Sequence, residues 1–216
     1  MRAPLIEGHR RTQSERTAET REALLDAAVA CLVELGYANT TTREVAIRAG
    51  VSRGAQTHHF PSKGELVAAA IEHVFDQQAR RFRDAFAALP EAQRTLDHAV
   101  DLLWEIVSGP SYAAVLEVTV AGRTDAELGV VVQGMATVLE RTVVGLLAEL
   151  FPALGDERVA RTIIDLGFTL VQGAAVSAYA GYGDPEHTIR LVRSLASLIT
   201  PERVQLLKGV LDVLDP

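Results

Sequence analysis

The chain is poor in cysteine, in strand-like patterns and in the motifs of catalysis. Its single cysteine, Cys31, cannot form a disulfide within the chain, so we expect a reducing compartment, the cytoplasm. No stretch alternates apolar and polar residues as a half-buried strand does. A glycine-rich phosphate loop, a nucleophile elbow and a zinc-ligand pair are all missing from the sequence. These absences favour an all-α protein that is not an enzyme and needs no cofactor.

Positive charge is also scarce, since the 216 residues carry a formal net charge of −7. That balance is unusual for a protein that binds nucleic acid. The distribution is uneven, however, because residues 1–83 hold 12 Lys and Arg against 10 Asp and Glu, and residues 84–216 hold 9 against 18. An acidic second part would repel phosphate, so any contact with DNA is expected from the first part alone.

Two short helices joined by a tight turn are predicted between Thr41 and Lys63. Thr41 and Glu44 have the spacing of a capping box, which opens a helix near Thr42. Gly50 suits the end of that helix, and Ser52 is a second N-cap that opens a helix at 53–59, before Pro61. Two helices joined by a short turn that contains glycine form a helix-turn-helix.

The second of these helices is polar, which suits the major groove of DNA. We expect Arg53, Gln56 and Thr57 to face base edges. Thr42, His59 and Lys63 should position phosphates. The complete predicted DNA-binding set is Thr41, Thr42, Arg43, Arg53, Gly54, Gln56, Thr57, His58, His59 and Lys63. A solvated surface helix with two incidental histidines is the alternative interpretation.

The stretch from Thr41 to Leu66 resembles the DNA-binding signature of TetR-family transcriptional regulators. The resemblance rests on Thr41-Thr42 at the start of helix two, Ala49-Gly50-Val51-Ser52 in the turn, His59-Phe60 at the end of helix three, and Ser62-Lys63 at the start of helix four. The chain has Gln56 and Thr57 where the family usually has a leucine-tyrosine pair, whose tyrosine contacts the DNA backbone. The resemblance implies a one-component regulator, a repressor that a small effector releases from a palindromic operator on double-stranded DNA.

The remaining pattern predicts helices throughout. Helix one is expected from Thr17 or Thr20 to Leu35, and a long helix from Ser62 toward Leu89. Further helices are predicted at 91–108, 111–123, 125–150, 156–181, 186–199 and 201–213. The expected domains are a helix-turn-helix domain at 17–64 and an α-helical effector-binding and dimerisation domain at 65–216.

The segment 163–182 is long and apolar enough to suggest a membrane span, but Asp165 and Gln172 interrupt it. A buried helix fits better, so no membrane association is expected. Small residues at three- and four-residue spacing would let another backbone approach closely; they are Gly173, Ala174, Ser177, Ala178 and Gly181. Helices 156–181 and 186–199 are therefore predicted to form a homodimer, with close packing inside one subunit as the alternative.

Bulky and polar residues on successive helices predict an effector pocket in the second domain. The expected lining residues are Phe82, Phe86, Trp104, Tyr112, Glu117, Met135, Phe168 and Gln172. Glu117 and Gln172 lie within apolar runs, where a buried polar group needs a partner. The expected ligand is largely apolar, with one polar or cationic group.

Two alternative functions follow from the same residues. One is a ligand-binding protein of this fold without specific DNA recognition. The other is an all-α metal-dependent enzyme that uses Asp97, Asp101 and Glu105, which share one helix face with His98 beside them. Spaced like charges are common on solvated helix faces, so we predict neither a catalytic nor a metal site.

Overall fold

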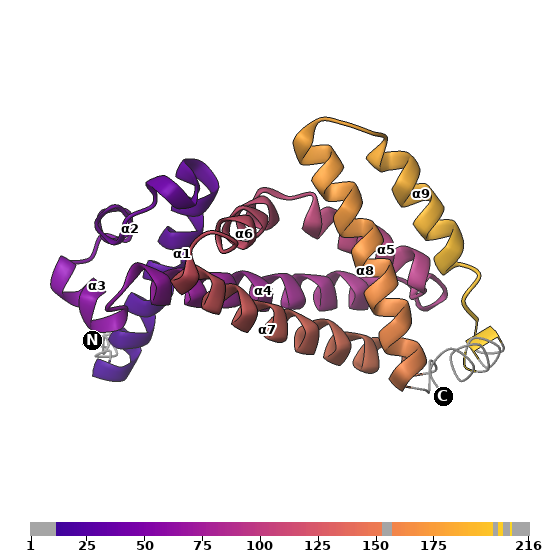
Figure 1. Ribbon diagram of the computed structural model, residues 1–216. Coiled ribbons are helices and arrows are strands. Elements are labelled where there is room, and N and C mark those ends of the chain that lie inside the picture. The colour runs from indigo at the N-terminus through magenta and orange to yellow at the C-terminus, as the bar shows by residue number, and fades with distance from the viewer. Residues whose placement is uncertain (1–11, 153–156, 201–202, 205–207, 209–216) are drawn as a thin grey trace, which may run out of the picture. The chain divides into compact units, whose positions relative to one another are not determined.

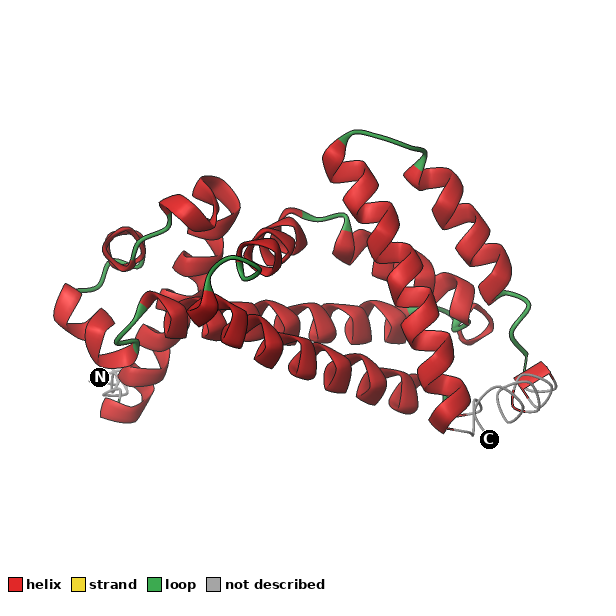
Figure 2. Ribbon diagram, in the orientation of Figure 1, coloured by secondary structure: helices red, strands yellow, loops and turns green. Residues whose placement is uncertain are grey.

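The structure is a computed structural model that describes residues 12–152, 157–200, 203, 204 and 208, and these residues confirm the all-α prediction (Figures 1 and 2). The elements are α1 (Gln13–Asn39), α2 (Thr42–Arg48), α3 (Arg53–His59), α4 (Lys63–Ala88), the 3-10 turn η1 (Glu91–Gln93), α5 (Leu96–Val107), α6 (Pro110–Ala121), α7 (Ala126–Leu150), α8 (Glu157–Ala180) and α9 (Pro185–Ala196). The helix predicted at 201–213 lies almost wholly outside the described residues.

The chain divides into two compact units, Met1–Ala70 and Ile71–Pro216. The division falls inside α4, whereas the sequence interpretation placed the domain boundary at 64/65, where α4 begins. A helix start is a natural boundary to choose from sequence. Here the first turns of α4 instead pack into the first unit, because Leu66 and Ala70 belong to its core.

Helix α1 begins earlier than Thr17 because Thr12 caps it. The Thr12 hydroxyl accepts from the Glu15 N–H at 3.2 Å, and the Glu15 carboxylate accepts from the Thr12 N–H at 2.6 Å. Gly36, the residue after the predicted end at Leu35, is a kink where φ is 73°, and helical residues continue to Asn39. The expected start of this helix was therefore wrong, and its expected end marks the kink.

The two predicted short helices are present, and each begins at the predicted N-cap hydroxyl. The Thr41 hydroxyl accepts from the Glu44 N–H, and the Ser52 hydroxyl accepts from the Ala55 N–H, both at 3.1 Å. Gly50 adopts φ 68° in the turn between α2 and α3. That left-handed conformation suits glycine because a Cβ would be too close to the following carbonyl oxygen.

The core of the first unit joins α1, α2 and the start of α4 with Phe60, which directly follows α3. Its buried members are Leu24, Leu25, Ala27, Ala28, Cys31, Val45, Phe60, Leu66 and Ala70. Burying a leucine or valine side chain stabilises a fold by about 1.5 to 3 kcal/mol. Cys31 has zero exposure in this core, and burial raises the pKa of its thiol.

In the second unit, α5, α8 and α9 pack against one another, α7 packs on α8, and α6 packs on α7 (Figure 1). The helix predicted from Glu91 starts instead at Leu96. The Arg94 side chain explains the difference, since it donates to the carbonyl oxygens of Ala87 at 2.7 Å and Leu89 at 3.1 Å. These bonds satisfy the end of α4 and leave residues 91–93 as a single 3-10 turn.

Two helices of this unit are long and apolar enough to cross a membrane by length and composition alone, Ala126–Leu150 and Arg158–Ala180. The second contains the apolar segment that the sequence interpretation assigned to a buried helix. One face of it is buried, because Val171, Ala174 and Ala175 join the core with Val107 and Ile189. Much of the remaining surface of α8 is exposed.

Replacing Gly50 with alanine should lower the free energy of unfolding by about 1 to 2 kcal/mol, because its φ of 68° is left-handed. A Cβ at Gly50 would meet nothing within 4 Å, so the cost is conformational and not steric. Gly134→Ala is the matched control on α7, where a Cβ also meets nothing, and should stabilise by about 0.5 to 1 kcal/mol. Urea denaturation measures both. Equal stability of Gly50→Ala and the wild type would contradict the left-handed turn.

Candidate functional site

Helix α3 presents a polar, exposed face in the first unit. Arg53, Thr57 and His58 are exposed, and Gly54 beside Arg53 leaves the backbone accessible. The guanidinium of Arg53 and the hydroxyl of Thr57 make no hydrogen bond or ion pair with any other described residue. These groups can therefore offer a guanidinium fork, a hydroxyl and an imidazole to an outside partner.

The expectation that Gln56 faces base edges is wrong. Gln56 is only 3% exposed, and its Nε2 donates to the carbonyl oxygen of Phe60 at 2.7 Å. That carbonyl stands just past the end of α3, where helix carbonyls lack partners within the helix. Gln56 thus fastens the C-terminal end of α3, and Phe60 itself is buried in the core.

The predicted residues of α2 have different accessibilities. Arg43 is exposed, Thr42 is half-buried, and the Thr41 hydroxyl already caps the helix. Arg48, the other basic residue of α2, pairs with Glu34 on α1, and that hydrogen bond lowers the pKa of Glu34. The accessible cations of the short helices are therefore Arg43 and Arg53.

Two predicted phosphate contacts have partners of their own. The Lys63 Nζ donates to the Tyr37 carbonyl oxygen at 2.6 Å and lies 4.0 Å from the centroid of the Tyr37 ring. His59 is half-buried, with its ring 5.7 Å from that of His58. An ammonium has three donor hydrogens, so Lys63 can hold Tyr37 and still donate to a phosphate. Both phosphate contacts stay predictions.

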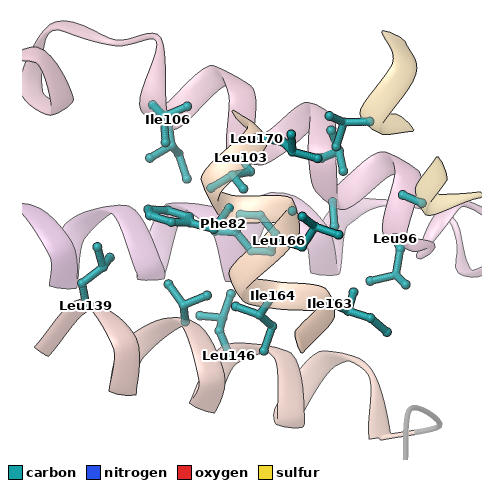
Figure 3. A pocket seen from close by; sticks show the side chains of 18 of the residues that line it. Phe82, Leu96, Leu103, Ile106, Leu139, Leu146, Ile163, Ile164, Leu166 and Leu170 are labelled. Carbon is teal, nitrogen blue, oxygen red and sulfur yellow. The ribbon is translucent and has the colours of Figure 1, made fainter. Parts of the chain in front are cut away.

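The second unit contains a cavity of about 430 Å³ lined by α4, α5, α6, α7, α8, α9 and Ile199 (Figure 3). In Figure 3, Leu103 and Ile106 of α5 lie above Phe82, and Leu139 and Leu146 of α7 lie below it. The volume falls within the range of about 300 to 1,000 Å³ that is usual for small-molecule sites. The cavity is the candidate site for a ligand.

Three of the eight predicted effector residues line this cavity: Phe82, Tyr112 and Phe168. Gln172 lies next to it and donates a short hydrogen bond to the Tyr112 hydroxyl. Two polar residues thus satisfy each other. Burial raises the pKa of Tyr112 to about 12, against the lowering effect of Gln172, so the phenol is neutral in the physiological range.

The other four predicted effector residues lie elsewhere. Phe86 is buried between Phe82 and Phe151, with ring centroids 6.2 Å and 5.1 Å away. Met135 is a buried residue outside the lining, and Trp104 packs against the α5–α8–α9 core. Glu117 is exposed beside a shallow hollow on α6. A bulky side chain in an apolar part of the sequence predicted burial correctly for Phe86 and Met135. It did not predict which buried side chains border the cavity.

Sequence reasoning missed the aliphatic lining and Gln78. The lining is mostly leucine, isoleucine and valine, which no sequence pattern separates from ordinary core. Gln78 is different, because it occupies a position in the apolar stripe of α4, between Phe75 and Phe82. A glutamine at a place where the helical period predicts an apolar residue is a signal that could have been read.

The alternative metal site does not form among the described residues. No group of three or more His, Cys, Asp or Glu side chains could hold an ion there. Asp101 instead pairs with Arg193 at 3.2 Å, and Asp97 lies 3.5 Å from His98. The acidic face of α5 is thus partly neutralised by α9.

Comparison with known proteins supports the first unit most directly. The family model "Bacterial regulatory proteins, tetR family" matches residues 24–70, which contain α2, α3 and most of α1. The HTH-type transcriptional regulator CymR of Pseudomonas putida is 37% identical over 132 residues, which are 61% of this chain and 64% of that protein. The chain spans about six tenths of the length of the curated relatives that it matches first.

Solved structures extend the likeness to both units. A TetR-family transcriptional regulator from Rhodococcus sp. has a TM-score of 0.66 at 17% identity, over 84% of this chain and 98% of that one. A transcriptional regulator from Saccharomonospora viridis in complex with choline has a TM-score of 0.62 at 16% identity, over 84% and 97% of the two chains. At these identities the likeness shows a shared fold.

Proposed function

Because this chain belongs to the TetR family of bacterial regulatory proteins, we propose that it is a one-component transcriptional repressor that binds a palindromic operator as a homodimer. A small, largely apolar effector in the cavity releases the operator. The family consists of transcriptional regulators and not of enzymes, which agrees with the sequence prediction. We also propose that the protein acts in the cytoplasm, where its operator lies.

The exposed polar face of α3 is the observation that carries the DNA-binding role. Arg53 and Thr57 have no partner among the described residues, and His58 is exposed beside them. Arginine reads guanine edges with two hydrogen bonds, and threonine suits either a base edge or a phosphate. Gln56, buried beneath this face, holds its backbone in place and does not read bases.

The proposed dimer would match the repeat of the DNA double helix. One short recognition helix makes few contacts, and a two-fold dimer places two of them about 34 to 36 Å apart, one helical turn of DNA. The second unit offers an apolar surface for this, because Leu166, Leu191 and Leu198 are each more than half exposed. Contiguous exposed apolar patches on soluble proteins mark interaction sites.

The small residues of α8 divide between two roles. Ala174 and Ala175 are buried in the core of their own unit, as the alternative of close packing within one subunit predicts. Gly173 and Ala178 are exposed and stay available to a second copy. The homodimer proposal therefore depends on the exposed side of α8 and on Leu191 and Leu198.

Effector release depends on linkage between the two sites. A ligand can lower DNA affinity only if it binds more tightly to the conformation that does not bind DNA. Such coupling amounts to about 1 to 3 kcal/mol in most proteins. Helix α4 supplies core residues to the first unit and cavity residues to the second, so one continuous helix belongs to both sites.

Arg53→Ala should weaken binding to the DNA upstream of its own coding sequence by about 1 to 3 kcal/mol and relax sequence preference. Arg141→Ala removes the same charge from the exposed surface of α7 and should leave affinity nearly unchanged. Gel shift or fluorescence anisotropy measures both variants. Folded wild-type protein that shifts no upstream DNA would support the rival function, a ligand-binding protein without DNA recognition.

Ala178→Glu should break the homodimer, because it places a charge on the exposed small-residue face of α8. Ala136→Glu makes the same change on the exposed surface of α7 and should leave the dimer intact. Sedimentation velocity distinguishes the 23.3 kDa chain from its dimer. A wild-type protein that stays monomeric at micromolar concentration would end the dimer proposal.

A further inference from the structure

The cavity of the second unit has walls without charge. Among the described residues that line it there is no Asp, Glu, Lys, Arg or His. The polar members are Gln78, Tyr112, Thr142 and Thr162, and the rest are aliphatic or aromatic residues or glycine. A ligand in this space would therefore meet almost only hydrocarbon.

The hydroxyl groups in the lining differ in whether their hydrogen is still free to be donated to a ligand. The Thr142 hydroxyl donates to the Val138 carbonyl oxygen at 2.9 Å, and the Thr162 hydroxyl donates to that of Arg158 at 3.0 Å. Each threonine oxygen can then only accept. The Tyr112 hydroxyl accepts from Gln172 and keeps its own hydrogen.

Among the polar side chains of the lining, Gln78 is the one that has no hydrogen-bond partner in the described part of the chain. Its amide lines the cavity from α4, it is half-buried, and it makes no hydrogen bond with another described residue. A ligand that fills the cavity would displace solvent from this amide, so it must offer a hydrogen bond in exchange. An amide both donates and accepts, so a hydroxyl or a carbonyl would satisfy it.

We propose that the cavity selects an uncharged, hydrophobic molecule with at most one or two hydroxyl or carbonyl groups, one of which bonds to Gln78. An ion that enters a hydrocarbon site loses its hydration, and no opposite charge in these walls would replace it. The sequence-based expectation of a cationic group depended on Glu117, which is exposed and lies outside the lining. The proposal rests on the proposed function only in treating this ligand as the effector.

The space is too large and too apolar to be a packing defect. Protein interiors are close-packed, with few voids larger than a water molecule. A water molecule in the cavity would make few hydrogen bonds, because a buried water needs two to four polar partners. Leu166 and Leu195 line the cavity and are 61% and 57% exposed in a single chain, so the space reaches the surface of the unit beside them.

Four probes with the same aromatic body test the selectivity: naphthalene, 2-naphthol, 2-naphthoate and 2-naphthylmethylammonium. Calorimetric titration and thermal shift of the full chain at neutral pH, without DNA, measure their binding. We expect the two neutral probes to bind, and the anion and the cation to bind at least about 100-fold more weakly. 2-Naphthol should bind more tightly than naphthalene because its hydroxyl pairs with Gln78.

Two variants place the binding in the cavity. Gly167 lines it from α8, and a Cβ there meets nothing within 4 Å, so Gly167→Leu should fill the space without a clash and abolish binding of the neutral probes. Gly134→Leu adds the same side chain on α7, outside the lining, and should bind as the wild type does. Gln78→Leu should weaken 2-naphthol by about 3- to 10-fold and leave naphthalene unchanged.

Several results would overturn the proposal. One is a charged probe that binds within tenfold of 2-naphthol, and another is a folded Gly167→Leu protein that binds the neutral probes as well as Gly134→Leu does. Failure of both neutral probes to bind the folded wild type would also overturn it. Because no DNA is present, these failures leave the DNA-binding proposal standing, and a protein that selects neutral probes but never binds DNA contradicts only the proposed function.

Discussion

The first unit depends on one physical constraint, which is that a seven-residue helix does not persist by itself in water. Isolated helices shorter than about 12 to 15 residues are marginal even in favourable sequences. Helices α2 and α3 have seven residues each, so tertiary packing must hold them. Val45 of α2 and Phe60 just after α3 supply it, because both are buried in the core with Leu24 of α1. The polar side of α3 can stay exposed because its stability comes from the opposite side.

Local signals set where α2 and α3 begin, whereas packing against other helices sets which of their side chains are exposed. The sequence therefore predicted the helices better than the contacts of their side chains. Caps are local, so the hydroxyls of Thr41 and Ser52 marked the starts of α2 and α3 correctly. The direction of Gln56 is decided by a carbonyl four residues later, whose orientation depends on how the chain leaves α3. The partner of Lys63 lies 26 residues earlier, at Tyr37, and no local pattern announces it.

The residues that line the cavity were even harder to predict from local sequence patterns. Helical spacing places Phe82, Phe86 and Met135 on apolar faces, and these are the faces that turn inward. Whether an inward residue fills space or borders it depends on the volumes of side chains from six helices. Gln78 is the exception, because a polar residue within an apolar stripe can be noticed from the sequence alone. A polar group that faces an apolar space needs a hydrogen bond from whatever fills that space, so such a position points to a ligand.

Hydroxyl-radical footprinting of the DNA upstream of the protein's own coding sequence tests whether a dimer reads DNA through two α3 helices. A dimer that presents two α3 helices should protect two short stretches on one face of the duplex, with centres about 10 base pairs apart or a multiple of that spacing. The two stretches should be related by a palindrome. Uniform cleavage at protein concentrations that saturate a gel shift, or a single protected stretch without a symmetric partner, would contradict a two-fold reader built on α3.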